Sequence, residues 1–234
     1  MSKATPSNHE KRVRRTTVLM GKGDLAIRIA EWFLRSEEYE LVAIVPVMPE
    51  PVWTKSLASW GRRNEVRVVE SGHYKDLPGI SNVEGGVDFT VSVFYDKIIK
   101  GWFIDKCKRI INVHNGPLPK YRGVAPINWA LKNEEHEHGI TIHEITPGID
   151  DGPIISQLKY AIYPEFDEVV DVYKRALEYG WVLFEQTIPL IDKIIPQEQK
   201  HDESTYYNKS DNTALGERSN FTRQASLVHE ASAR

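Results

Sequence analysis

Residues 16–34 read TTVLMGKGDLAIRIAEWFL, and this stretch decides the fold. Thr16 to Met20 is a β-branched and apolar run that ends at a glycine, which is typical of a buried strand. From Leu25 to Leu34 apolar residues cover one broad face, which predicts a helix with Asp24 as its N-cap. A strand, a glycine turn and a helix in this order predict the first part of a βαβ unit.

Further strands follow along the chain. Apolar runs predict strands over residues 41–47, 66–69, 87–95 and 109–113, and helical stretches separate them. Strands that alternate with helices favour a parallel sheet built from right-handed βαβ units. We therefore predict an α/β fold with a Rossmann-like, mostly parallel, twisted sheet and flanking helices.

The second half of the chain departs from this alternation. Residues 140–145 and 154–162 predict two strands joined by a short loop, so we expect an antiparallel or irregular pair there. Residues 167–195 carry the longest helical pattern, which Gly180 and Pro189 are expected to bend or end early. The composition then turns polar, and five apolar residues are candidate anchors for this extension: Tyr206, Tyr207, Leu215, Phe221 and Leu227.

The composition is that of a globular chain without a basic footprint. Its 234 residues include 30 basic and 33 acidic ones, a formal net charge of −3. This balance argues against nucleic acid and anionic lipid as partners. The single Cys107 fits a reducing compartment and is too little for a cysteine-rich metal site. No apolar run approaches the ~18 residues that cross a membrane. Together with the single cysteine, this predicts a cytoplasmic protein, and we expect no metal site.

The glycine turn MGKGDLA satisfies the pattern G-x-G-x-x-G/A with Gly21, Gly23 and Ala26. Such a turn presents backbone N–H groups and the positive end of a helix to an anion. An NAD site would also need an acidic residue at the end of the next strand, where prolines precede Glu50. We weigh a phosphate site that includes Lys22 against a tight turn that binds nothing.

Residues 110–123, IINVHNGPLPKYRG, place Asn112 and His114 at the carboxyl end of a predicted strand. Residues i and i+2 of a strand project to one face, so the two side chains point together. The NGPLP segment that follows is a turn, and open α/β sheets bind ligands at such strand ends. We favour a functional role for both residues over a structural one.

A second polar bend lies in ITPGIDDGPII, residues 145–155. Gly148 and Gly152 bracket Asp150 and Asp151, so two carboxylates lie at a corner between predicted strands. Asp and Gly are also ordinary turn residues, so this bend alone leaves a functional and a solvated alternative open.

Together these segments resemble the formyltransferase family that uses 10-formyltetrahydrofolate, and within it most of all the sugar N-formyltransferases. The matching patterns are Asn-x-His, then x-x-x-Leu-Pro-x-x-x-Gly, then Gly-Ile-Asp-x-Gly. Residues 1–15, with five basic residues and no apolar periodicity, predict a flexible basic arm. The resemblance implies the formyltransferase fold, with a catalytic domain over 16–195 and an extension over 196–234. It also implies three catalytic residues: Asn112, His114 and Asp150. One departure is that Asn115 and Gly116 follow the histidine, where the family often has Ser-Leu-Leu-Pro.

The implied reaction explains these residue types. Formyl transfer to an amine passes through a tetrahedral intermediate with a developing oxyanion. Asn112 would donate a neutral N–H to it, and His114, as an imidazolium, would donate a second and pass a proton. Asp150 would accept from His114, which raises the imidazolium fraction and orients the ring.

A pocket for the donor, 10-formyltetrahydrofolate, is likewise implied by the resemblance. It would lie between a loop before the Asn-x-His strand and the loop at Asp150. The implied lining residues are Phe94, Tyr95, Asp96, Lys97, Ile98, Phe103, Thr146 and Gly148, with Ile98 and Phe103 as an apolar wall.

The implied acceptor is the amine of a small molecule, for which we favour a nucleotide-linked amino sugar. Tyr121, Arg122 and Trp129 would border it, and Gly21, Lys22 and Gly23 would bind it as well. The alternatives are a glycinamide ribonucleotide formyltransferase of purine synthesis and a non-catalytic nucleotide-binding module. A methionyl-tRNA formyltransferase has an additional C-terminal barrel and a basic surface, which residues 196–234 and the negative charge do not match. A homodimer is a further possibility.

Overall fold

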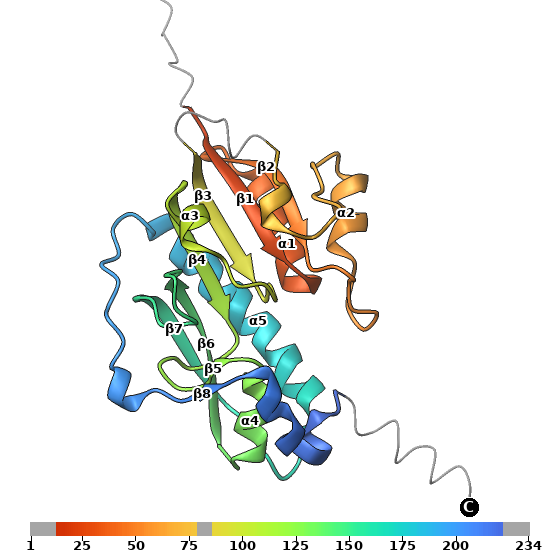
Figure 1. Ribbon diagram of the computed structural model, residues 1–234, viewed down its shortest axis with the longest axis vertical. Coiled ribbons are helices and arrows are strands. Elements are labelled where there is room, and N and C mark those ends of the chain that lie inside the picture. The colour runs from red at the N-terminus through yellow and green to blue at the C-terminus, as the bar shows by residue number, and fades with distance from the viewer. Residues whose placement is uncertain (1–12, 79–85, 222–234) are drawn as a thin grey trace, which may run out of the picture.

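A six-stranded sheet forms the centre of the computed structural model, which describes residues 13–78 and 86–221 (Figure 1). The strands are β1 (Arg15–Gly21), β2 (Tyr39–Pro46), β3 (Val87–Val93), β4 (Cys107–His114), β6 (Glu137–Glu144) and β7 (Ile154–Ala161). Their order is β2-β1-β3-β4-β6-β7. The first four are parallel, β6 runs antiparallel to β4, and β7 runs antiparallel to β6. The predicted α/β class and the antiparallel pair are both confirmed.

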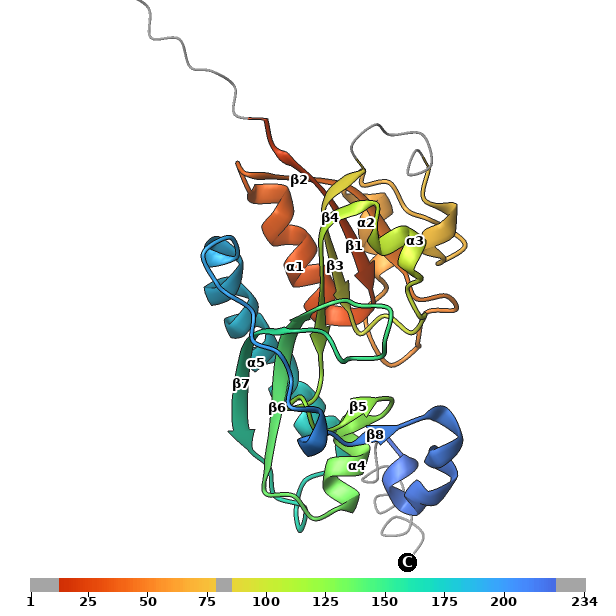
Figure 2. The ribbon, with the colours of Figure 1, turned by 60° about the vertical axis from the view of Figure 1, so that its left-hand side comes forward.

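Helices cover both faces of this sheet (Figures 1 and 2). They are α1 (Gly23–Arg35), α2 (Leu57–Arg63), α3 (Gly101–Ile104), α4 (Pro126–Lys132) and α5 (Val169–Thr187). Strand residues alternate between the two faces, so Leu19 and Val91 join the core under α1 and α5. Val18 and Met20 point the other way, into a second core that includes Phe103 of α3.

The start of α1 and residues 66–69 differ in detail from the sequence prediction. Asp24 lies in the first turn of α1, and the N-cap position is Lys22, whose side chain makes no capping bond. The predicted strand over residues 66–69 makes a single bridge, between Val68 and Ile44 of β2. This segment is therefore an edge contact and not a seventh strand of the sheet.

Helix α5 is shorter than its sequence pattern. It ends at Thr187, and a 3₁₀ helix that contains Pro189 follows, because a proline ring cannot continue an α-helix interior. Gly180 does not break the helix. A Cβ at this glycine would lie 2.6 Å from Cδ1 of Ile140 in β6, so the missing side chain lets α5 approach the sheet closely.

The extension beyond residue 195 folds back on the core. Strand β8 (Tyr206–Tyr207) pairs in parallel with β5 (Arg122–Gly123), and the 3₁₀ segment Lys209–Ser219 packs on α4. Of the candidate anchors, Leu215 is buried in a core with Tyr207 and Phe221, whereas Tyr206 is 49% exposed. Leu227 and residues 1–12 of the predicted arm lie outside the described residues, and Arg15 belongs to β1. Within the described ranges, no helix has the length and apolarity that a membrane span requires.

Candidate active site

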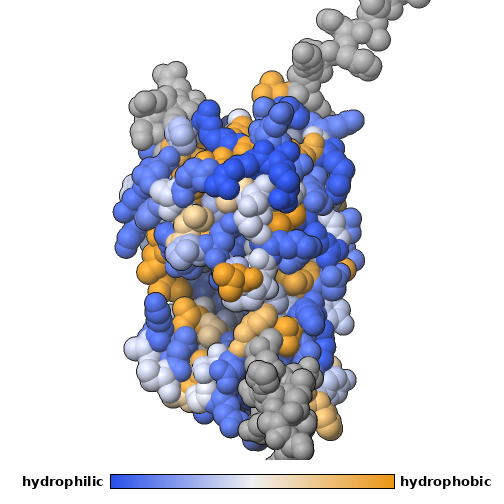
Figure 3. All heavy atoms as spheres, turned by 90° about the vertical axis from the view of Figure 1, so that its right-hand side faces the viewer, coloured by the Kyte–Doolittle hydropathy of each residue, from blue (hydrophilic) through white to orange (hydrophobic). Residues whose placement is uncertain are grey.

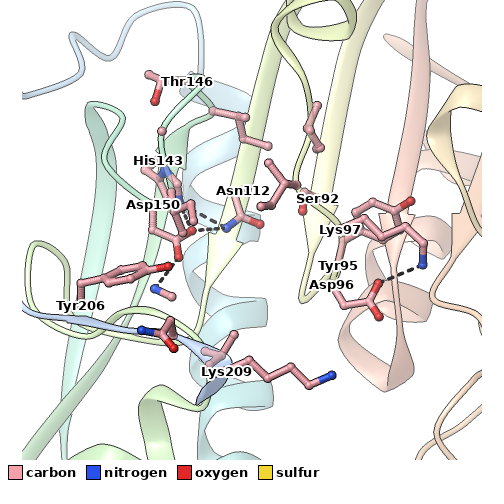
Figure 4. Close-up of a pocket in the computed structure, with 18 residues that line it drawn as sticks. Ser92, Tyr95, Asp96, Lys97, Asn112, His143, Thr146, Asp150, Tyr206 and Lys209 are labelled. Carbon is pink, nitrogen blue, oxygen red and sulfur yellow. Dashed lines mark hydrogen bonds and ion pairs between the residues drawn. The ribbon is translucent and has the colours of Figure 1, made fainter. Parts of the chain in front are cut away.

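Asn112 and His114 lie at the carboxyl end of strand β4, beside the carboxyl ends of the parallel strands β1 and β3. The antiparallel register places His143 of β6 directly opposite Asn112. Asp150 comes from the bend between β6 and β7 and returns over the same edge (Figure 4). The pleat of two neighbouring strands and one short connection thus bring these four side chains together.

Short polar contacts join these side chains. Nδ2 of Asn112 donates to Oδ1 of Asp150 at 3.3 Å and lies 3.2 Å from Nε2 of His143. Nδ1 of His114 lies 3.5 Å from Oδ2 of Asp150. The three residues that the resemblance implies as catalytic therefore form one cluster around the Asp150 carboxylate.

His143 belongs to this cluster as well, although the resemblance did not implicate it. Its Nδ1 lies 2.8 Å from the carbonyl oxygen of Glu144, which only accepts, so Nδ1 carries the proton. Its Nε2 faces both Nδ2 of Asn112, at 3.2 Å, and Oδ1 of Asp150, at 3.5 Å. Without a proton Nε2 accepts from Asn112, and with a proton it faces the carboxylate. The signal in the sequence was the strand alternation, which did not say which face of β6 meets the site.

The His114 ring is buried between two oxygen acceptors. Nε2 donates to the carbonyl of Tyr121 at 2.8 Å, and Nδ1 faces Asp150. Burial lowers the pKa of His114, and the Asp150 charge opposes this without reversing it. The ring therefore loses its proton more readily than a free histidine. When it is protonated, it has an oxygen partner for each N–H.

Asp150 is held as the carboxylate. Burial alone would raise its pKa, but His114, His143 and the backbone N–H of Gly123 lower the pKa of Asp150 well below its ordinary range. The Gly123 N–H donates to Oδ2 at 2.9 Å. Asp150 also has a left-handed backbone with φ of +50°, which costs a non-glycine residue about 1 kcal/mol. Its neighbour Asp151 accepts a short hydrogen bond from Thr146 and so stabilises the bend.

One cavity, of about 390 Å³, opens beside this cluster. Figure 4 shows Tyr95, Asp96 and Lys97 on one side of Asn112 and Asp150, and Tyr206 and Lys209 below. Six residues that were expected to line the donor pocket lie around this cavity: Tyr95, Asp96, Lys97, Ile98, Thr146 and Gly148. Ser92, Val124, Asn208 and Lys209 also line it, and no sequence pattern had marked them.

A second cavity, of about 340 Å³, adjoins the first. The two share six lining residues: Tyr95, Asp96, Asn112, Gly123, Val124 and Asp150. The lining of the second cavity includes one basic side chain, Lys22, and four aromatic ones: Trp53, Phe94, Tyr173 and Phe221. Figure 3 shows a hollow in the molecular surface, bordered by apolar side chains. The cluster thus lies between two cavities, an arrangement that suits a reaction between two substrates.

Phe94 and Phe103 lie elsewhere than the sequence prediction placed them. Phe94 follows β3 with φ of +55° and faces the second cavity, near Tyr173. Phe103 is fully buried in the core against Tyr74, with ring centroids 4.8 Å apart, so it lies beneath the cavity and does not form its wall. An amphipathic turn such as α3 buries one aromatic residue, and the sequence did not show that Phe103 is that residue.

The expected border of the acceptor also differs. Trp129 stacks on Tyr207 with ring centroids 4.2 Å apart in the core under α4. Tyr121 is buried and donates its hydroxyl to Glu135, while the guanidinium of Arg122 is buried against Gln199. Among the described residues, these three line neither cavity, since the extension packs over them.

Neighbouring residues pack closely against the two glycines of the turn. A Cβ on Gly21 would lie 2.2 Å from the carbonyl oxygen of Val93, and one on Gly23 would lie 2.6 Å from Oγ1 of Thr54. Both glycines therefore serve close packing between strand, helix and loop, and only Lys22 of the turn reaches the second cavity. Burial lowers the pKa of Lys22, and the charge of Asp96 acts against this.

Three aromatic residues of the second cavity escaped the sequence reasoning as site residues. Trp53 lies in a loop, Tyr173 follows the apolar pattern of α5, and Phe221 was noted only as an anchor. Phe221 stacks on Trp53 at 4.5 Å, and Trp53 meets Tyr173 edge-on at 5.3 Å. Residues so far apart in sequence carry no joint local signal.

Comparison with known proteins agrees with this fold. Residues 81–188 match the family model described as formyl transferase, so this part of the chain is similar to that family. A methionyl-tRNA formyltransferase of Lactococcus lactis subsp. cremoris is 29% identical over 209 residues, 81% of this chain and 62% of that protein. One from Ehrlichia ruminantium is 26% identical over 208 residues, 82% of this chain and 66% of that protein. The chain thus spans less than two thirds of the length of these curated relatives.

Solved structures are similar over more of their length. An N-formyltransferase from Helicobacter canadensis, in complex with folinic acid and dTDP-3-aminofucose, superposes with a TM-score of 0.72 and 27% identity, covering 85% of this chain and 72% of that one. A formyltransferase from Anoxybacillus kamchatkensis, in complex with UDP-4,6-dideoxy-4-formamido-L-AltNAc and tetrahydrofolate, has a TM-score of 0.59 and 25% identity, covering 85% of this chain and 88% of that one.

Proposed function

We propose that this protein transfers the formyl group of 10-formyltetrahydrofolate to the amine of a small molecule. The observation that carries the proposal is the cluster of Asn112, His114 and Asp150 between two cavities. Two substrates, one in each cavity, would meet at these side chains. The folates in the similar solved structures support this donor.

The cluster provides the groups that formyl transfer needs. One hydrogen of the Asn112 amide is directed at His143 and Asp150, which leaves the other for the formyl oxygen as it becomes an oxyanion. The attacking amine must lose a proton, and the leaving nitrogen of the donor must gain one. His114, with its lowered pKa and the ionised Asp150 beside it, is suited to carry that proton.

The first cavity is our proposed donor site. It is bordered by the chain from Tyr95 to Ile99 and by the bend from Thr146 to Asp150, so apolar side chains such as Ile98 and Ile149 and polar ones such as Ser92 and Thr146 surround the space. Tyr95 is fixed there, since its hydroxyl donates to the carbonyl of Gly72 at 2.8 Å. A border that combines apolar side chains with a few polar groups suits a flat, polar-edged ring like a pterin.

The second cavity is our proposed acceptor site, and a nucleotide-linked amino sugar is the acceptor that we favour. Its aromatic side chains offer flat surfaces for a ring, and Lys22 offers a charge for a phosphate. The dTDP- and UDP-linked sugars in the similar solved structures support this choice. The curated relatives named for methionyl-tRNA make that aminoacyl-tRNA the competing acceptor.

An assay with 10-formyltetrahydrofolate and a panel of amines tests the proposal. The panel contains dTDP- and UDP-linked amino sugars, glycinamide ribonucleotide and methionyl-tRNA. We expect turnover of an amino sugar, and His114→Gln and Asp150→Asn should each lower kcat on the order of 10²–10³-fold. The matched control is His136→Gln, because His136 is exposed and pairs only with Glu165 among the described residues.

Each outcome decides a different part of the proposal. Full activity of both site variants would refute the assignment of the cluster. Turnover of glycinamide ribonucleotide or methionyl-tRNA with every sugar inert would refute the sugar acceptor alone. No formyl transfer to any amine, together with tight binding of a dinucleotide, would favour the non-catalytic alternative.

A further inference from the structure

Gln199 belongs to the polar extension, yet its side chain is buried against the bend that carries Asp150. It is 5% exposed. Its Nε2 donates to the carbonyl oxygens of Asp150 at 2.9 Å and of Gly152 at 2.7 Å. Both hydrogens of this amide are therefore used on the main chain of the bend, on either side of Asp151.

Arg122 determines which way the Gln199 amide faces. The guanidinium Nε and Nη2 donate to Oε1 of Gln199 at 3.1 and 2.6 Å. A guanidinium has only donors, so the amide oxygen must face it and the amide nitrogen must face the bend. Arg122 is itself 8% exposed, so water does not compete strongly for these bonds.

The residue next to Arg122 completes a closed ring of contacts around Asp150. The backbone N–H of Gly123 donates to the carboxylate at 2.9 Å. Asp150 is thus held at its carboxylate by Gly123 and at its carbonyl by Gln199, and these two groups are connected through Arg122. Such double support fits a residue whose backbone is left-handed, since an unfavourable φ persists only where the surroundings enforce it.

The chain on both sides of Gln199 is anchored. The main chain of Gln197 exchanges two hydrogen bonds with Ile154 of β7, at 2.7 and 2.8 Å. Beyond Gln199, strand β8 pairs with β5, which contains Arg122 and Gly123. The extension therefore presents the Gln199 amide to the bend from a fixed frame and not from a loose tail.

We infer that Gln199 is a positioning residue, which holds the Asp150 carboxylate in register with Nδ1 of His114. The inference rests on the proposed function for its consequence in catalysis, but the positioning itself is a property of the fold. Without the Gln199 amide, two buried carbonyls of the bend lose their donor, and the bend relaxes away from its left-handed conformation. The carboxylate then moves from His114, from which it is 3.5 Å distant.

The variant Gln199→Glu tests this role. It keeps the size of the side chain and its contact with Arg122, while it removes the amide hydrogens that the bend uses. We expect kcat to fall about ten- to a hundredfold, because small displacements of a catalytic group cost that much. The KM values for donor and acceptor should stay within about threefold, since Gln199 lines neither cavity among the described residues.

A spectroscopic readout separates positioning from mere stability. The His114 ring, identified in a histidine NMR spectrum by its loss in His114→Gln, should titrate at lower pH in Gln199→Glu, because a displaced carboxylate supports the imidazolium less. His143 also faces this ring, 6.2 Å away between centroids, and is left unchanged. The matched control is Gln197→Glu, the same change two residues earlier at an exposed side chain, which should leave kcat and the titration unaltered.

The outcomes distinguish this inference from the proposed function. An active wild type with unchanged kcat and unchanged His114 titration in Gln199→Glu would overturn the positioning role. A wild type that is inactive with every amine, but whose His114 titration still shifts in the variant, would refute the proposed function and support the positioning. If Gln199→Glu does not fold, Arg122→Lys, which keeps the charge but loses the paired contact, should shift the titration in the same direction, and no shift would overturn the role.

Discussion

At the scale of single residues, burial and partners give the histidines of this sheet edge different properties. His138 of β6 is fully buried, and its Nε2 donates to the carbonyl of Asn115 beside the proposed acceptor site. Burial lowers the pKa of His138 to about 4, and the bond to Asn115 only partly opposes this. His138 is therefore a neutral hydrogen-bond donor that supports the loop after His114.

This pKa predicts how stability depends on pH. The folded value lies below the ordinary value of about 6.5, so the unfolded chain binds more protons in between. The contribution of His138 is complete above about pH 6.5 and is lost as the pH falls toward 4, at most about 3 kcal/mol. Urea unfolding measures how far the free energy of unfolding declines between about pH 7 and pH 4. His138→Gln should decline less than the wild type, and His136→Gln should decline as much as the wild type. An equal decline in the wild type and both variants would contradict the lowered pKa of His138.

At the scale of elements, α5 connects the two halves of the sheet. Gly180 lets α5 approach β6 closely. The Phe184 ring contacts Trp32 and Phe33 of α1 edge-on, with ring centroids 5.5 and 5.8 Å away. The parallel half and the antiparallel half thus share one apolar core under this helix pair.

Truncation of Phe184 should therefore be costly. The side chain is fully buried, so Phe184→Ala should lower the free energy of unfolding by about 3–5 kcal/mol. The neighbouring Glu185 is exposed, and Glu185→Ala should change it by less than about 0.5 kcal/mol. Denaturant unfolding of both variants measures the difference. A loss below about 1 kcal/mol for Phe184→Ala would mean that α5 packs less tightly than the structure indicates.

At the scale of the whole molecule, the extension completes both cavities. Tyr206, Asn208 and Lys209 border the first one, and Phe221 borders the second. The Phe221 ring is placed by a bond from the N–H of Val170 to its carbonyl and by its stack on Trp53. Segments near residues 53, 173 and 221 therefore meet at the proposed acceptor site.

The variant Phe221→Ala should weaken binding of the acceptor. Loss of one aromatic contact predicts a rise in the acceptor dissociation constant of about two- to tenfold, measured by calorimetry. Donor binding should stay within about twofold, because Phe221 does not line the first cavity. Phe166→Ala, at a residue 85% exposed, is the control and should change neither constant. An equal loss of donor and acceptor binding would show a general disturbance and not a local contact.

Much of the fold could be predicted because its signals are local. The strands at residues 16–20, 41–47 and 109–113 are apolar runs, and their pleat directs Asn112 and His114 to one side. The bend at Asp150 was visible from its glycines. The sequence did not predict that Trp129 and Phe103 lie in the core, since an aromatic residue looks the same in sequence whether it lines a cavity or fills a core.

What the sequence by itself determined was the order of strands and helices, the mostly parallel sheet and the polar residues at its edge. These follow from periodicity and turn chemistry within short windows. Only the tertiary structure decided that His143 faces Asn112, that Gln199 holds the Asp150 bend, and that Phe221 meets Trp53. Such contacts join residues that lie far apart in sequence, and their geometry exists only after the core has packed.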